Sequence, residues 1–110
     1  MALALVLGKL SPEATKGLLN QGLAAREEYF RGLAEPRGIK VLGYYFAEGG
    51  EWDVVVLLET NEDAEASSVA ATFTVQATGM YTNYRAIRLY SPADVDAALA
   101  DAVSIRAPGS

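Results

Sequence analysis

The chain has 110 residues, of which 51% are hydrophobic and 21% are charged. This length and composition predict one globular domain with a single core. The 14 acidic residues outnumber the 9 basic ones and no basic stripe is present, so we expect neither nucleic acid nor a membrane as a partner. Cysteine and histidine are absent, which excludes disulfides, thiolate nucleophiles, histidine acid–base catalysis and Cys/His zinc sites.

We also expect no cofactor and no metal. The cluster Glu62, Asp63 and Glu65 stands at an expected helix start, where the helix dipole accounts for acidic side chains. Without histidine to activate a serine, a serine triad is excluded. The apolar start lacks a basic leading region and predicts a strand rather than a signal peptide. Absence of cysteine is compatible with the cytoplasm, which is the location we expect.

The first half of the chain predicts a strand, a helix and a second strand. The strands span Ala2 to Gly8 and Ile39 to Phe46. Ser11-Pro12-Glu13 starts the helix, since serine caps, proline suits the first turn and glutamate suits the positive end. The helix is expected to reach about Ala34, and Gly22 within its apolar face would allow close approach to a sheet. That face consists of Thr15, Leu18, Leu19, Gly22, Tyr29, Phe30 and Leu33.

The second half predicts a hairpin, a second long helix, a fourth strand and a short helix. A turn at Glu48 to Glu51 leads into the third strand, Trp52 to Glu59. The second helix is expected from Thr60 to about Thr78, closed by Gly79. The fourth strand spans Met80 to Tyr90, and a helix capped by Ser91 continues to about Ala100.

This order, β-α-β-β-α-β, predicts an α+β ferredoxin-like fold: a four-stranded antiparallel sheet with two helices on one face, plus the short C-terminal helix. Residues 1–100 would form the single domain and residues 101–110 a C-terminal tail. In this topology the first and third strands are central, and they are the two most apolar strands.

The third strand predicts a dimer. Its run Asp53-Val54-Val55-Val56-Leu57-Leu58-Glu59 is apolar on both faces, so both faces must be covered. Two helices about 10 Å wide cover only one face of a four-stranded sheet. We therefore expect a homodimer through the uncovered sheet face, with a monomer that binds a lipophilic ligand in an apolar groove as the rival interpretation.

The hairpin resembles the signature stretch of the GYD domain family. The resemblance rests on Gly43-Tyr44-Tyr45-Phe46 and on Gly50-Glu51-Trp52-Asp53-Val54-Val55-Val56, supported by Leu23 to Glu28 and Arg88 to Ser91. It implies a GYD-like ferredoxin-fold domain of the dimeric α+β barrel superfamily, in which two sheets pack face to face. The family's activity is undefined, so the resemblance implies a fold and no reaction.

The chain departs from the family's pattern at two points. Trp52 replaces the usual tyrosine, and the hairpin is about one residue longer. Only the aromatic bulk of Trp52 and the carboxylate of Asp53 are carried over as ligand-binding candidates.

Arg26 lies in the middle of the apolar face of the first helix. Because an arginine rarely enters a core without an anionic partner, Arg26 would hold an anionic ligand in a cavity between helix and sheet. In the structural alternative it extends to the rim, or pairs with Asp53 or a glutamate. Asp53 would be a general base, or alternatively accept hairpin amides or bind an arginine.

Edge-strand residues complete the candidates. Tyr44 and Tyr45 face opposite sides of the sheet, so one of them would line a given cavity and serve as a catalytic donor. Tyr84 and Arg85 would bind ligand, with Arg85 closing the mouth of a pocket. The alternatives are packing for the tyrosines and a solvated or ion-paired edge for the arginine.

Three functions are compatible with these candidates. The first is a homodimeric small-molecule-binding or accessory protein, with a pocket between sheet and helices or at the dimer seam. The second is a cofactor-independent oxygenase, isomerase or cyclase acting on an aromatic or polyketide-like molecule, which needs Asp53, a tyrosine and Arg26 in one dry pocket. The third is a purely structural dimer.

Overall fold

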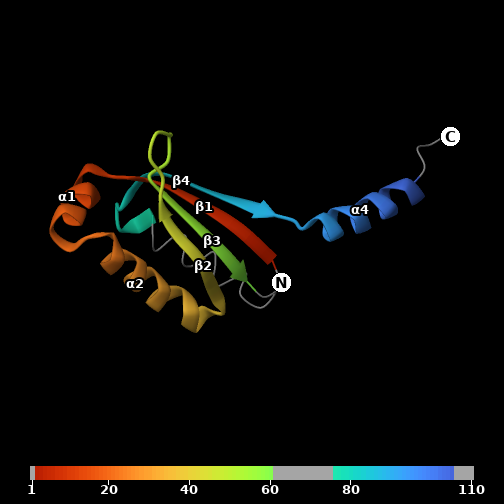
Figure 1. Cartoon of the computed structure of the whole chain (residues 1–110), viewed down its shortest axis with the longest axis horizontal. Helices are drawn as coiled ribbons and strands as arrows, with labels where there is room; N and C mark the ends of the chain where they lie inside the picture. Colours follow the sequence, from red (N-terminus) through yellow and green to blue (C-terminus); the bar gives the residue numbers. More distant parts are fainter. Residues whose placement is uncertain (1, 61–75, 106–110) are drawn as a thin grey trace.

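A computed structural model describes residues 2–60 and 76–105 of the chain (Figure 1). Four strands form one antiparallel sheet in the order β2-β3-β1-β4. They are β1 (Ala2–Leu10), β2 (Ile39–Phe46), β3 (Val54–Thr60) and β4 (Tyr81–Leu89). This order confirms the predicted ferredoxin-like sheet, with the apolar β1 and β3 at its centre.

One face of the sheet carries the core. Val6 on β1 pairs with Val56 on β3, and both side chains are buried on the side of the helices. Most of the remaining core comes from the same face of the sheet and the helices above it. The buried apolar residues are Val6, Leu10, Ala14, Ala34, Ile39, Val41, Val54, Val56 and Leu58.

The predicted continuous first helix is wrong, because the chain breaks it at Gly22. The structure has α1 (Pro12–Gln21), α2 (Leu23–Ala34) and a short 3₁₀ turn, η1 (Glu35–Arg37). Gly22 adopts φ 81° and ψ 165°, a backbone conformation that only glycine occupies readily. A Cβ at Gly22 would meet nothing within 4 Å, so the glycine is needed for its conformation rather than for close packing.

The break also changes which residues share a face. Leu19 and Tyr29 were expected on the apolar face, yet they are 85% and 56% exposed. Helical periodicity holds only within an unbroken helix, so a face calculated across Gly22 misplaces residues on either side of it. Leu18 and Phe30 from the same predicted face do pack against the core.

The predicted second helix lies almost entirely outside the described residues. Within the described part, Gln76 and Ala77 are helical and Gly79 has φ 68°, consistent with the predicted helix end. Thr60, the expected cap of that helix, is the last residue of β3.

The strand boundaries differ from the prediction by one or two residues, most at the start of β3 and at the end of β1. β3 begins at Val54, because Trp52 and Asp53 belong to the connection from β2, where the Ala47 amide donates to the Asp53 carbonyl at 2.8 Å. β1 continues to Leu10, so that its end lies beside the start of β4.

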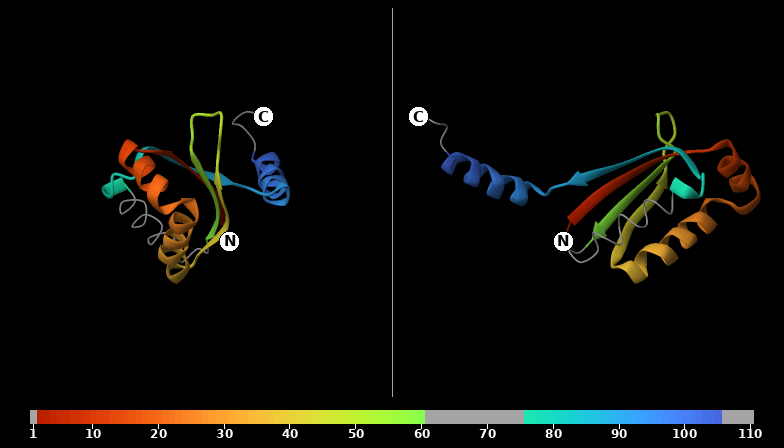
Figure 2. Two further views of the ribbon diagram at one scale, coloured as in Figure 1. Left: turned by 60° about the vertical axis from the view of Figure 1, so that its left-hand side comes forward. Right: turned by 180° about the vertical axis from the view of Figure 1, so that it is seen from behind.

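The second face of the sheet has no described element over it. Figure 2 shows α1 and α2 on one side of the sheet only. Leu5, Leu7, Val55 and Leu57 point to the other side and are half-buried, and Tyr45 there is 62% exposed. We call this side the open face.

The C-terminal helix α4 (Pro92–Ser104) is four residues longer than predicted and extends away from the sheet (Figure 1). All of its residues are exposed. The chain therefore has extents of 63 × 32 × 23 Å and a radius of gyration of 17.4 Å. A compact domain of this length has a radius of gyration of about 13 Å. None of the helices in the described ranges is long and apolar enough to cross a membrane.

The helix break predicts opposite effects for two glycine substitutions. Gly22→Ala should lower the free energy of unfolding by about 1–3 kcal/mol, because alanine is strained at φ 81° and ψ 165°. Gly32→Ala, at an exposed position within α2 with no atom within 4 Å of the added methyl, should raise it by about 0.5–1 kcal/mol. Urea unfolding of the two variants tests this, and an equal sign for both would contradict the assigned break.

Candidate functional site

Arg26 lies between the two segments of the broken helix. Its Nη2 donates to the carbonyl oxygen of Ala14 at 3.2 Å, which joins α2 to α1 across Gly22. Gly17 leaves room for the guanidinium, since a Cβ there would lie 3.1 Å from Nη2. The break at Gly22 thus brings a residue of α2 beneath α1, a position it would not reach from a straight helix.

The other two nitrogens of this guanidinium are left without partners. Arg26 Nε and Nη1 are buried and form no hydrogen bond within the described part of the chain. Arginine remains charged at all relevant pH values, and an unsatisfied buried donor costs about 1–3 kcal/mol. Most buried polar groups in proteins have a partner, so this pair of donors makes Arg26 a candidate functional residue.

Two tyrosines from opposite edges of the sheet meet near this guanidinium. Tyr44 is on β2 and Tyr81 is on β4, and a side-chain hydrogen bond joins them. Gly8 on the central strand β1 makes this possible. A Cβ at Gly8 would lie 2.5 Å from the Tyr81 ring, so only glycine lets the ring pass across the sheet.

Burial keeps both phenols neutral. It raises the pKa of Tyr44 above its ordinary value, and the neighbouring Tyr81 raises it further, while Arg26 opposes this effect. Burial likewise raises the pKa of Tyr81, against the effects of its hydrogen bond with Tyr44 and of Arg26. The direction of these effects makes Tyr44 the donor and Tyr81 the acceptor of their hydrogen bond, so the Tyr81 hydroxyl and the Arg26 guanidinium are the donors of this region.

Aromatic rings surround these polar groups. The rings of Phe30 and Tyr44 lie 5.9 Å apart at 53°, and those of Tyr81 and Tyr84 lie 6.1 Å apart at 50°. Such tilted pairs are favourable contacts, and they give the region flat apolar walls. We call Arg26, Tyr44, Tyr81 and their aromatic neighbours Phe30 and Tyr84 the Arg26 cluster.

Glu27, which adjoins Arg26 in the sequence, is paired with another arginine. Glu27 is close enough to raise the pKa of Tyr44, but its Oε2 accepts from Arg31 Nε and Nη2 at 3.0 and 2.8 Å. Arg31 also donates to the carbonyl of Val41 on the edge strand β2 at 2.8 Å. Glu27 is therefore committed to a structural pair that holds α2 against the sheet.

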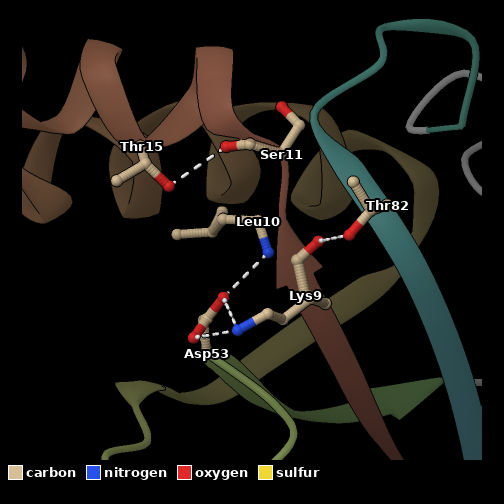
Figure 3. A network of polar contacts seen from close by, with 6 residues as sticks. All are labelled: Lys9, Leu10, Ser11, Thr15, Asp53 and Thr82. Carbon is tan, nitrogen blue, oxygen red and sulfur yellow. Dashed lines mark hydrogen bonds and ion pairs between the residues drawn. The ribbon is translucent and has the colours of Figure 1, made fainter.

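Asp53 binds the end of β1 (Figure 3). One carboxylate oxygen accepts the amide of Leu10 at 3.0 Å, and Lys9 Nζ lies 3.3 Å from each oxygen. The Asp53 amide also donates to the Gly8 carbonyl at 3.0 Å. Asp53 thus joins the hairpin to the end of β1, and it makes no contact with Arg26.

The remaining candidates divide between the two faces. Tyr84 is opposite Gly8, on the helix side with Arg26 and Tyr44. Arg85 and Tyr45 are exposed on the open face, where Tyr45 lies over Gly43. Trp52 is half-buried in the hairpin connection.

Tyr81 was absent from the predicted site residues because of a register shift. Simple alternation puts Tyr81 and Tyr84 on opposite faces, since they are an odd number of residues apart. The pairing of β1 with β4 shifts between Lys9 and Leu10, which turns both rings toward the helices. A comparable shift in β2, between Val41 and Gly43, turns Tyr44 rather than Tyr45 toward Arg26.

A hollow lies on the outer surface of α2. It is an open depression of about 500 Å³, lined by Ala24, Glu27, Glu28, Arg31, Gly32 and Glu35. Its only cation, Arg31, is already paired with Glu27. No group of three acidic residues in the described ranges is arranged to hold a metal ion. This acidic, solvent-open surface carries no candidate chemistry.

Comparisons with known proteins leave both the family and the site open. The sequence matches no protein-family model and no curated protein. Solved structures of similar fold include an uncharacterized NIPSNAP domain protein from Burkholderia xenovorans, which is 15% identical, with a TM-score of 0.49, over 84% of this chain and 96% of that chain. At this identity and TM-score the likeness carries no information on the site. Membership of the GYD domain family therefore stays a prediction.

The contacts of Asp53 predict that replacing Asp53 and replacing its partner Lys9 lower the free energy of unfolding by unequal amounts. Asp53→Ala should lower the free energy of unfolding by about 1–3 kcal/mol, because the partly buried Leu10 amide loses its acceptor. Lys9→Ala removes only a partly exposed ion pair and should change it by less than about 1 kcal/mol. Denaturant unfolding of both variants measures the difference. Equal losses would contradict the hydrogen bond as the main contribution.

The buried phenols predict a loss of stability at alkaline pH. The folded-state pKa of Tyr44 is raised above the unfolded value of about 10, so the folded state binds more protons than the unfolded state above that pH. The contribution of Tyr44 is complete below pH 10 and is lost as the pH rises toward the folded pKa. Tyr44→Phe should therefore flatten the fall in unfolding free energy between about pH 10 and 11.5, and Tyr81→Phe should act in the same direction. Unchanged slopes in both variants would contradict the burial of these phenols.

Proposed function

We propose that the chain is a homodimeric protein that binds a small organic acid at the Arg26 cluster. The single observation that carries this proposal is the charged guanidinium of Arg26, two of whose nitrogens are buried and find no hydrogen-bond partner among residues 2–60 and 76–105. A carboxylate or a similar anion would supply acceptors for these donors and neutralise the charge. The free-energy cost of burying these two donors would be recovered when a ligand supplies the acceptors.

The surroundings of Arg26 suggest the rest of the ligand. Both phenols are protonated at neutral pH, and the Tyr44 hydroxyl donates to Tyr81, so the Tyr81 hydroxyl can donate to a carbonyl or hydroxyl oxygen. The rings of Phe30 and Tyr84 provide flat apolar contact. The chemistry therefore favours an acid with a flat or aromatic body, an anionic group toward Arg26 and a second oxygen toward the tyrosines.

The homodimer is supported by the open face. The sheet is apolar on both sides, and none of the described elements covers the side formed by Leu5, Leu7, Val55 and Leu57. Pairing two such faces about a two-fold axis would remove this apolar surface from water and bring Tyr45 and Arg85 to the seam. Two sheets packed this way would form the dimeric α+β barrel that the resemblance implies.

The catalytic alternative has no comparable support. It requires a general base near Arg26, and the candidate base Asp53 is held by the Leu10 amide and Lys9 instead. A phenol whose pKa is raised is a weak base at neutral pH as well, because it is protonated. Binding is the function that these residues favour.

Ligand binding predicts a specific response of Arg26. Native mass spectrometry of freshly purified protein should reveal a bound acid. Added salicylate or 4-hydroxybenzoate should shift the Arg26 Nε–H signal in ¹⁵N NMR spectra. Arg26→Met should weaken binding at least tenfold, the loss expected for a charged hydrogen bond of about 1.5–3 kcal/mol. Arg37→Met, which removes an exposed guanidinium that donates to the Leu33 carbonyl, is the matched control.

The stability of the same variants separates binding from a structural role. Without ligand, Arg26→Met should stay within about 1 kcal/mol of the unsubstituted protein, because removing two unsatisfied buried donors offsets the lost bond to Ala14. A loss well beyond that value, with no probe binding to the unsubstituted protein, would show that Arg26 is a structural residue and overturn the proposal.

A further inference from the structure

The α4 helix lies outside the compact body of the protein and has an apolar side of its own. Val95, Leu99 and Val103 are spaced by four residues and therefore share one side of the helix. They are 43%, 57% and 82% exposed, and Ile105 just beyond them is 70% exposed. The helix leaves the sheet on the side opposite to α1 and α2 (Figure 2, left), which is the side of the open face.

A helix of this size is not expected to be stable by itself. α4 has 13 residues, and isolated helices shorter than about 12–15 residues are marginal in water. The Ser91 hydroxyl caps its start by accepting the Asp94 amide at 3.1 Å, but a cap adds only about 1 kcal/mol. No basic side chain stabilises its last turn. The helix therefore needs a surface to pack against.

The total surface area indicates how much is left uncovered. The chain exposes 7550 Å². A compact monomer of its mass, 11.7 kDa, exposes about 5,900 Å². The excess, about 1,650 Å², is more than the roughly 800 Å² that each partner buries in a standard interface. An additional subunit is large enough to cover such an area.

We propose that α4 is an exchanged arm: its Val95–Leu99–Val103 side packs on the open face of a second copy of this chain, and the second copy returns the same contact. This inference rests on the proposed homodimer and adds the element that completes it. In such an arrangement the arm and the sheet faces form one continuous interface.

Charge complementarity supports a second copy as the occupant. The charged residues of α4 are all acidic: Asp94, Asp96 and Asp101. Arg85 is exposed on the open face, opposite Leu7. Among residues 2–60 and 76–105, neither Arg85 nor these aspartates form an ion pair. An arm from a second copy would bring acidic and basic groups together at the edge of the apolar contact.

The connection to β4 favours exchange over folding back. Only Tyr90 and Ser91 separate β4 from α4, and Ser91 is used as the helix cap. Arg88 stacks over the Tyr90 ring, 5.3 Å from its centroid, and holds this short connection in the direction that leads away from the sheet. To cover its own open face, the chain would have to reverse direction within these two residues, next to the Arg88–Tyr90 contact.

Hydrogen exchange combined with light scattering tests the arm on the full-length chain. Above the concentration at which light scattering shows twice 11.7 kDa, α4 amides should be strongly protected, and on dilution they should exchange as the dimer dissociates. Unprotected α4 amides in a clear dimer would overturn the arm and leave the homodimer standing. A species of 11.7 kDa at all micromolar concentrations would overturn both, and protected α4 amides in that monomer would show that the helix folds back.

Two matched substitutions on α4 separate its sides. Leu99→Asp should weaken dimerisation about 10- to 100-fold, because it removes a large apolar side chain from the contact. Ala97→Asp adds the same charge on the opposite side of the helix and should change dimerisation by less than about threefold. Protection of β1 amides confirms that both variants are folded. Equal effects of the two substitutions would contradict the assigned contact side.

Discussion

The central pair of strands, β1 and β3, is apolar on both sides, and this constraint shapes the rest of the molecule. Val6 and Val56 lie on one side beneath the helices, whereas Leu7 and Val55 lie on the other without a described cover. A strand pair of this kind is stable only when both of its sides are removed from water. The helix side holds the Arg26 cluster, and the open face is where we propose the second copy and its arm.

The helix side shows how a polar group is brought into an apolar layer. Gly22 breaks the first helix, which directs Arg26 back toward α1, and Gly8 lets the Tyr81 ring cross the sheet toward Tyr44. Two glycines on different elements, one chosen for backbone conformation and one for space, therefore build a single site. The resulting cluster has buried donors in excess of acceptors, which is the reverse of what a purely structural core requires.

Much of the architecture was accessible from the sequence. Apolar runs, Ser-Pro helix starts and the Gly49-Gly50 turn predicted the described strands, the start of the first helix and the antiparallel order, because these signals act within a few residues. Arg26 was also recognisable, as a charge on an apolar face. The continuity of the first helix was mispredicted, because glycine adopts helical and positive-φ backbone conformations with similar ease. Which of them Gly22 takes depends on how its neighbours pack. Tyr81 was not among the predicted site residues, and of the alternatives left open for Asp53 a pair with Arg26 is not formed, because Asp53 accepts the Leu10 amide and pairs with Lys9.

The sequence by itself determined the class of fold and the surplus of apolar sheet, since both follow from residue order and local periodicity. The tertiary structure decided which tyrosines face Arg26, because that depends on register shifts in β2 and β4 that alternation does not reveal. It also decided that Asp53 binds the Leu10 amide and so joins the hairpin to β1, and that α4 points away from its own sheet. Those outcomes depend on contacts between residues distant in sequence, whose geometry is set only when the whole sheet has formed.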